Sequence, residues 1–224
     1  MSEINNIIER YNRRKENKAV IKNSKYFYFN YFARIDREQK YLEIIEKLFP
    51  DKKTIKVLEI GAGYGINLFF FLQSGVPKKN IYANELLEER IEALKENFSE
   101  CNLLLGDASE LNFYEEFDIV MQSTVFTSVL DNNFRKKLAA KMFNMTKRNG
   151  IILWYDFIYN NPKNPDVKGI TKREVIKLFP DAKKIKFFNV TLAPPIGRRV
   201  GRFYPIINFL FPFLRTHIIA VIYK

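Results

Sequence analysis

Cysteine and histidine are almost absent from this sequence of 224 residues, which contains one of each, Cys101 and His217. One cysteine excludes an internal disulfide, and the two residues together are too few to hold a structural zinc ion. No pair of carboxylates stands out as a metal site, so we expect no metal. Glycine is also scarce, with nine residues, but three of them are Gly61, Gly63 and Gly65.

Long apolar runs are lacking too, since a membrane-spanning helix needs about 20 residues. The stretch 203–214 is strongly apolar, but it is short and contains two prolines. Because Arg202 and Arg215 flank it, residues 198–215 could lie in a membrane interface, with the arginines on lipid phosphates. They could equally form a covering segment on the edge of a sheet, and we favour this second interpretation.

Acidic residues are scarce at both ends of the chain, and the formal net charge is +12. Residues 1–56 carry a net +6 and residues 160–224 a net +10, whereas residues 57–159 carry −4. Basic flanks around an acidic middle favour an anionic partner; a solvated Lys-rich surface is the alternative. The first 18 residues are charged and lack the apolar core of a signal peptide, so we expect a cytoplasmic protein.

Strands and helices are expected to alternate from residue 56 onward. Apolar and β-branched runs predict strands at 56–60, 80–84, 102–105, 117–122, 150–157, 184–192 and 216–223. Helical spacing predicts helices at 66–74, 87–97, 133–146 and 171–179. This alternation indicates βαβ units, and hence an α/β fold with a parallel sheet covered on both faces.

The N-terminal region is expected to be mostly helical, because Ile4, Ile7 and Ile8 recur at helical spacing. The aromatic run 26–32 is too continuous to decide between helix and strand; it could cover a ligand pocket or simply pack. We divide the chain, as one domain over 1–224, into a helical extension (1–50), a ligand-binding core (55–160) and C-terminal strands (161–224) with a basic and apolar insertion (194–215).

The three clustered glycines follow a short apolar strand in the sequence Val-Leu-Glu-Ile-Gly-Ala-Gly-Tyr-Gly, residues 57–65. Glycine permits positive φ angles and lets a ligand approach the main chain. The helix that begins after the loop offers free N–H groups to an anionic group. A dinucleotide fingerprint would need glycine or alanine at Ile66, so the loop predicts a different ligand.

Glu59 and the glycines form the pattern E-x-G-x-G-x-G, which resembles motif I of the class I S-adenosylmethionine (SAM)-dependent methyltransferases. The resemblance implies a Rossmann-like fold: a seven-stranded, mostly parallel sheet with an antiparallel edge strand and helices on both faces. It also implies SAM as cofactor, with its methionine part held by Glu59, Gly61, Ala62, Gly63 and Gly65.

Later positions fit the same resemblance in order. Glu85 ends the second strand, where a carboxylate can accept both ribose hydroxyls. Asp107, in Gly-Asp-Ala after the third strand, resembles the motif that accepts a hydrogen bond from the adenine amine. Residues 147–150 resemble the turn before the fifth strand. The other implied contacts are Leu86, Ala108, Gln122 and Ser123.

The acceptor is less well specified. Residues 122–126 lack the Asn/Asp-Pro-Pro-aromatic motif of nucleobase amine methyltransferases, which disfavours methylation of a base amine. Methylation of a pyrimidine carbon in RNA generally needs a nucleophilic cysteine, but we expect Cys101 to lie away from the pocket as a small core residue. Oxygen or a small-molecule amine remains as the methylated group. Asp156, at the end of the fifth strand, and His217 are candidate general bases; each has a structural role as its alternative.

The segments 154–157, 192–195 and 214–217 resemble small methyltransferases of sugar and surface-polysaccharide biosynthesis. We therefore predict an enzyme that O-methylates a sugar or glycan intermediate, phosphate-bearing or lipid-linked, at the cytoplasmic face. Methylation of a lipid or quinone-like molecule, methylation of RNA, and a non-catalytic SAM-binding relic stay open as alternatives, with nucleic acid disfavoured. The sequence does not specify an oligomeric state.

Overall fold

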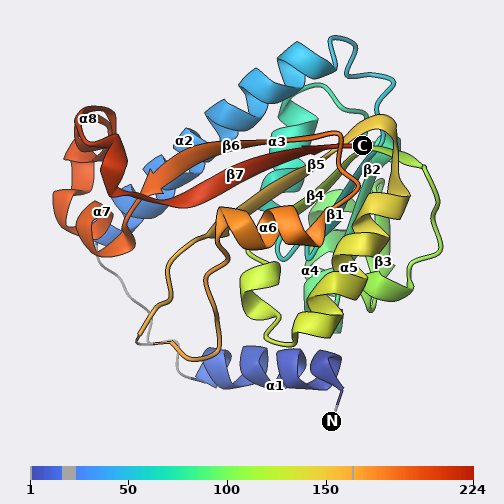
Figure 1. Cartoon of the computed structure of the whole chain (residues 1–224), viewed down its shortest axis with the longest axis horizontal. Coiled ribbons are helices and arrows are strands. Elements are labelled where there is room, and N and C mark those ends of the chain that lie inside the picture. The colour runs from blue at the N-terminus through green and yellow to red at the C-terminus, as the bar shows by residue number, and fades with distance from the viewer. Residues whose placement is uncertain (1, 17–23, 163) are drawn as a thin grey trace.

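The computed structural model describes residues 2–16, 24–162 and 164–224. In these residues seven strands form one sheet in the order β3-β2-β1-β4-β5-β7-β6 (Figure 1). The strands from β1 to β5 pair in parallel, and β7 runs antiparallel between β5 and β6. The expected mostly parallel, Rossmann-like sheet with an antiparallel strand at one side is confirmed. The strands are β1 (Val57–Ile60), β2 (Ile81–Glu85), β3 (Asn102–Leu105), β4 (Phe117–Ser123), β5 (Thr146–Phe157), β6 (Lys184–Leu192) and β7 (Arg215–Tyr223).

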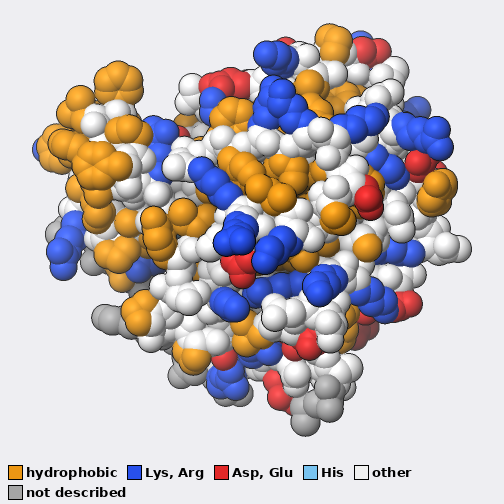
Figure 2. All heavy atoms as spheres, in the orientation of Figure 1, with side chains coloured by type: hydrophobic (Ala, Val, Ile, Leu, Met, Phe, Trp, Pro, Cys, Tyr) orange, Lys and Arg blue, Asp and Glu red, His pale blue; other side chains and the backbone are white. Residues whose placement is uncertain are grey.

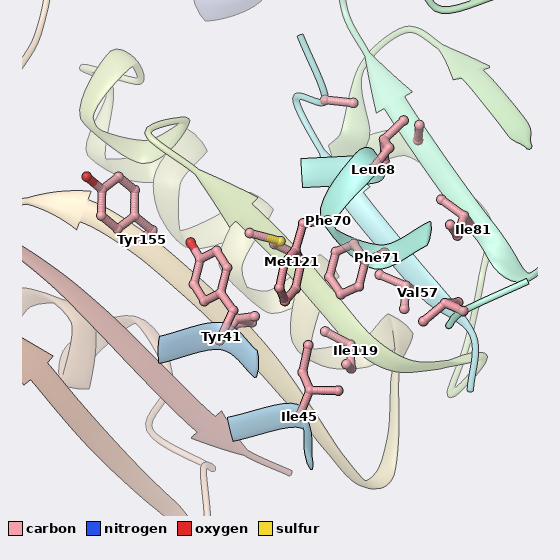
Figure 3. Packing of buried hydrophobic residues seen from close by; sticks show 14 of the residues in the cluster. Tyr41, Ile45, Val57, Leu68, Phe70, Phe71, Ile81, Ile119, Met121 and Tyr155 are labelled. Atoms are coloured by element: carbon pink, nitrogen blue, oxygen red, sulfur yellow. The ribbon is translucent and has the colours of Figure 1, made fainter. Parts of the chain in front are cut away.

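Helices cover both faces of this sheet. Side chains of α2 (Ser24–Leu48), α3 (Ile66–Gln73) and α4 (Glu88–Phe98) join one buried apolar cluster, part of which Figure 3 shows. Side chains of α5 (Asn132–Met145) and α6 (Lys172–Leu178) join a second cluster on the opposite face. Val57 contributes to the first cluster and Leu58 to the second, because successive strand residues point to opposite faces.

The aromatic run 26–32 is helical, because it lies within the 25-residue helix α2. The later part of α2 buries Tyr41 and Ile45 against the sheet (Figure 3). Its earlier part buries Phe29 and Ala33 in a small separate cluster. The preceding helix α1 (Glu3–Glu16) lies apart from both layers, below the sheet in the view of Figure 1. The mostly helical extension is thus confirmed for the described residues.

The turn expected at 147–150 is instead part of β5, which already begins at Thr146. The β4–β5 register shifts between Phe117 and Ile119, and Asn149 has a positive φ of 67°. A Cβ on Gly150 would come within 2.8 Å of the Asp118 carbonyl oxygen, so only glycine fits this close approach. The expectation of a separate turn was wrong because the irregularity is absorbed inside the strand.

The insertion 194–215 packs mainly on α2 and also covers β6, the edge strand of the sheet, in line with the favoured interpretation. It contains α7 (Pro194–Val200) and α8 (Tyr204–Leu210), joined by the 3-10 turn η4 (Gly201–Phe203) and followed by the turn η5 (Pro212–Leu214). Leu192 and Tyr204 form the small cluster with Phe29 and Ala33. The part of the chain that the structure describes has no helix long and apolar enough to cross a membrane.

Candidate active site

The candidate active site lies where the strand order reverses, between β1 and β4. In open α/β sheets, ligands bind at the carboxyl ends of the strands beside such a switch point. A cavity of about 390 Å³ is found there. The residues predicted to bind the cofactor that line it are Glu59, Gly61, Ala62, Gly63, Glu85, Leu86, Asp107, Ala108 and Ser123.

The glycine loop is held in place by its own backbone N–H groups. The Ala62 N–H donates to the Asn84 carbonyl oxygen (2.9 Å), and the Gly63 N–H donates to the Glu85 carboxylate (2.8 Å). Gly63 has a φ of 60°, and a Cβ built on it would meet no atom within 4 Å. This glycine therefore leaves room over the loop for a ligand.

Gly65 and Gln122, also predicted to bind the cofactor, are not among the residues that line the cavity. Gly65 is the N-cap of α3 with a φ of 80°, and a Cβ there would collide with the ring of Phe98. Gln122 is fully buried, accepting from the Val125 N–H (2.9 Å) and donating to Asp156 (3.0 Å). Both residues therefore support the loops that line the cavity without lining it themselves.

Glu85 ties the glycine loop to the start of α4. One carboxylate oxygen accepts from the Leu86 and Leu87 N–H groups (2.9 and 3.1 Å). The other accepts from the Gly63 N–H and lies 3.5 Å from Nη1 of Arg90. Three N–H donors use three of about four acceptor positions of a carboxylate, so Glu85 can take a further hydroxyl while it holds the loop.

Asp107 follows β3 and caps the short 3-10 turn η2 (Ala108–Glu110). Its carboxylate accepts from the Ser109 N–H (2.8 Å) and the Ser109 hydroxyl (2.9 Å). Near it the cavity wall is apolar, formed by Val129, Phe134 and Leu138. A carboxylate beside apolar side chains suits a flat ring with a donor on its edge.

A cluster of three polar side chains, one each from β1, α2 and α3, forms part of the cavity wall. Glu59 accepts a hydrogen bond from Nδ2 of Asn67 (2.6 Å), and Arg37 of α2 donates to Oδ1 of Asn67 (3.2 Å). The Arg37 guanidinium also lies 4.8 Å from the ring centroid of Tyr155. Burial raises the pKa of Glu59 to about 8, although Asn67 and Arg37 oppose this.

Two atoms of this group have no hydrogen-bond partner among the described residues: Oε2 of Glu59 and Nε of Arg37. Both are buried, and both residues line the cavity. A buried polar atom without a partner costs free energy. The pair can therefore bind a ligand that brings both a cation and an anion.

Asp156 does not reach the cavity. It is fully buried, and its carboxylate accepts from the Thr127 hydroxyl (2.6 Å) and the Gln122 amide (3.0 Å). Burial raises its pKa to about 7, which suits a base, but both oxygens are engaged by protein donors. Its role as general base stays a prediction.

His217 also lies outside the cavity lining. Its ring stacks on Tyr155 with centroids 5.3 Å apart and contacts Phe157 edge-on. Burial lowers its pKa to about 4, which makes it a weak base at neutral pH. Cys101 is buried in the first apolar cluster, as expected of a small core residue.

The sequence did not predict that α1 would cover the cavity. Ile4, Ile7 and Tyr11 line it. Glu3 fixes the start of the helix by accepting from the Leu130 N–H (2.8 Å), and Arg10 donates to the Ser128 carbonyl oxygen (3.0 Å). The apolar spacing of Ile4 and Ile7 was the available signal, but it did not reveal which surface they face.

Comparisons with known proteins agree with this geometry. Residues 57–150 match the model of a family described as a methyltransferase domain, whereas a comparison with curated proteins finds no match. Among solved structures, the fold is similar to a SAM-dependent methyltransferase from Archaeoglobus fulgidus (TM-score 0.59, 16% identity, 84% of this chain and 94% of that chain).

Two further structures extend this likeness. A TehB-like SAM-dependent methyltransferase from Corynebacterium glutamicum has a TM-score of 0.56 and 16% identity, over 96% of this chain and 97% of that chain. A Burkholderia thailandensis 1,6-didemethyltoxoflavin-N1-methyltransferase with bound S-adenosylhomocysteine has a TM-score of 0.59 and 15% identity, over 84% and 78%. At these identities the likeness establishes the fold.

Residues 57–150 therefore contain a methyltransferase domain, and the solved structures that share the fold are SAM-dependent methyltransferases, which supports SAM as the cofactor. The cavity fits that molecule, which carries an ammonium, a carboxylate, a ribose and an adenine, and supplies a methyl group from its sulfonium. Unpartnered atoms of Glu59 and Arg37 suit the first two groups. The open space at Gly63 leaves room for the ligand to approach the loop.

Proposed function

We propose that Glu59 and Arg37 hold the two charged groups of the methionine part of SAM. The ammonium would lie against Oε2 of Glu59, and the carboxylate against the Arg37 guanidinium and the N–H groups at the start of α3. The support is that both side chains are buried, line the cavity and carry one unpartnered atom each. Asn67 hydrogen-bonds both residues and so sets their spacing.

The rest of the cofactor would extend across the ends of β2 and β3. Glu85 would accept a ribose hydroxyl, and Asp107 the adenine amine, with the adenine ring against Phe134 and Leu138. Neighbouring strands are about 4.8 Å apart. The residues that follow β1, β2 and β3 would therefore form a row along which the methionine part, the ribose and the adenine can lie in order. Leu86, Ala108 and Ser123 complete the walls of this row.

The acceptor in our proposal is a hydroxyl of a sugar or glycan intermediate that carries a phosphate or is linked to a lipid. The observation that carries this choice is the charge of the C-terminal part, +10 over residues 160–224. A positive surface raises the local concentration of an anionic substrate. A quinone-like lipid is the second candidate, because large apolar side chains are exposed on the insertion 194–215.

The proposal is tested by incubating the protein with SAM labelled in its methyl group and with four acceptors: sugar phosphates, lipid-linked sugars, a quinone-like lipid and RNA. We expect label on a sugar oxygen. The matched control is Gly63→Val, whose side chain would fill the open space at the loop and should abolish transfer.

Label found only in RNA or only in the quinone-like lipid would overturn the sugar assignment. Calorimetry with SAM separates these cases from a non-catalytic relic. A relic would bind SAM without transferring the methyl group to any acceptor, or would bind none.

A further inference from the structure

The insertion forms a projecting part of the molecule, which we call the C-terminal lobe (residues 194–214). Figure 2 shows apolar side chains gathered over this lobe, at the left where Figure 1 places α7 and α8. Phe209 is 81% exposed and Phe213 is 77% exposed. The neighbouring exposed apolar residues are Phe203, Ile206, Leu210 and Phe211. A contiguous apolar surface of this kind marks an interaction site.

The exposure is not the result of a loosely attached segment. Tyr204 is buried, stacks on Phe32 with centroids 6.0 Å apart, and accepts from the Leu192 N–H (3.1 Å). Asn208 donates to Asp36 (3.0 Å) and accepts from Nε of Arg215 (2.9 Å). The inner side of the lobe is thus fixed to α2, β6 and β7, whereas Phe209 and Phe213 are exposed on its outer side.

Basic residues lie beside this apolar surface on the same lobe. The sequence from residue 182 to residue 224 contains eight Lys or Arg and no Asp or Glu. Three of these basic residues, Arg198, Arg199 and Arg202, are exposed on α7 and η4. An apolar face flanked by arginines complements the headgroups and acyl chains of an anionic bilayer.

A second copy of the chain is a poorer occupant of the same surface. A two-fold interface brings identical patches together, and here it would place the arginines of both copies beside each other without intervening acids. A bilayer surface offers phosphates instead. The lobe also projects from the body of the molecule (Figure 1), a shape suited to partial insertion into a soft interface.

We propose that the C-terminal lobe docks on an anionic lipid bilayer, with Phe209 and Phe213 inserted at the boundary of headgroups and acyl chains. Arg199 and Arg202 bind lipid phosphates beside them. This docking goes beyond the methyl-transfer proposal and requires neither SAM nor an acceptor. A failure of docking is therefore distinguishable from a failure of the proposed function.

The test is sedimentation of the whole protein with vesicles of phosphatidylcholine, alone or mixed with phosphatidylglycerol. We expect binding to the mixed vesicles and much weaker binding to pure phosphatidylcholine. Phe209→Ala/Phe213→Ala should weaken binding about a hundredfold, because two large apolar side chains are removed. The control Tyr114→Ala/Tyr159→Ala removes two exposed rings elsewhere and should bind as the unaltered protein does.

A second pair of variants tests the charges. Arg199→Glu/Arg202→Glu should weaken binding to the mixed vesicles by more than about tenfold, whereas Lys136→Glu/Lys177→Glu, the same charge change on α5 and α6, should have little effect. Circular dichroism checks that each variant folds. Three outcomes overturn the proposal: no binding to either vesicle, equal loss in lobe and control variants, or a dimer in ultracentrifugation that dissociates on Phe209→Ala/Phe213→Ala.

Discussion

Glu59 and Asp156 are both buried carboxyl groups on strands of the same sheet, and burial raises the pKa of each, to about 8 and to about 7. They differ in their surroundings. Glu59 lines the cavity and has one oxygen without a partner among the described residues. Asp156 lies outside the lining, and Thr127 and Gln122 engage both of its oxygens. A raised pKa alone therefore does not distinguish the two carboxyl groups, whereas an unpartnered oxygen on a residue that lines the cavity does.

The largest expected effect tests the ligand-binding role of the cavity wall through Arg37, the cation that shares Asn67 with Glu59. Arg37→Met should weaken SAM binding about a hundredfold, because a hydrogen bond between charged groups contributes about 1.5–3 kcal/mol. Calorimetry measures the dissociation constant. The matched control is Arg34→Met on the outer side of the same helix, which should leave the affinity unchanged. Equal affinities for both variants would remove Arg37 from the site.

The next effect tests the structural role of Asp156, whose two oxygens accept from Thr127 and Gln122. Asp156→Asn turns one hydrogen-bond acceptor into a donor that faces Thr127 or Gln122, and should lower the free energy of unfolding by about 2 kcal/mol. Urea denaturation measures this loss, and SAM affinity should not change. Thr127→Val, which removes the partner hydroxyl, should have a similar cost. If Asp156→Asn loses methyl transfer while it keeps its stability and SAM affinity, Asp156 is a catalytic base and the comparison fails.

The smallest expected effect is the release of a proton from Glu59 when SAM binds. An ammonium beside Glu59 favours the ionised carboxylate, so SAM binding should lower the raised pKa and release up to about one proton near neutral pH. The affinity should then rise from about pH 6 to about pH 8 and level off above the pKa of Glu59 in the free protein. Calorimetry in buffers of different ionisation enthalpy measures the release.

Glu59→Gln should abolish this release and weaken SAM binding about tenfold, since one charge-assisted hydrogen bond becomes neutral. Asp156→Asn should keep the release, because its carboxyl group does not meet the cofactor. An unchanged release in Glu59→Gln would show that another group titrates.

Sequence patterns predicted much of this fold, because strand and loop signals are local. The strands β3 and β6 have the predicted bounds, and the glycine loop lies at the end of β1 as the spacing of Gly61 and Gly63 indicated. Glu85 and Asp107 line the same cavity because parallel strands end at one edge.

The parts that the sequence did not predict depend on contacts between distant segments. Arg37 meets Asn67 and Tyr155 only when α2 packs on the sheet. Asp156 was expected at the open edge because it is near the end of β5, but β5 stays paired with β7 through Phe157. Its side chain lies beneath Thr127, which a strand pattern alone does not show.

Two consecutive residues of α2 serve different parts of the molecule. Asp36 accepts from the Thr191 N–H (2.7 Å) and from Asn208 of the C-terminal lobe, whereas Arg37 reaches the wall of the cavity. A helix turns about 100° per residue, so one inserted residue between the aromatic start of α2 and Asp36 would rotate the aromatic side away from the lobe or Arg37 away from Asn67. The length of this helical segment is therefore constrained together with the side chains of Asp36 and Arg37.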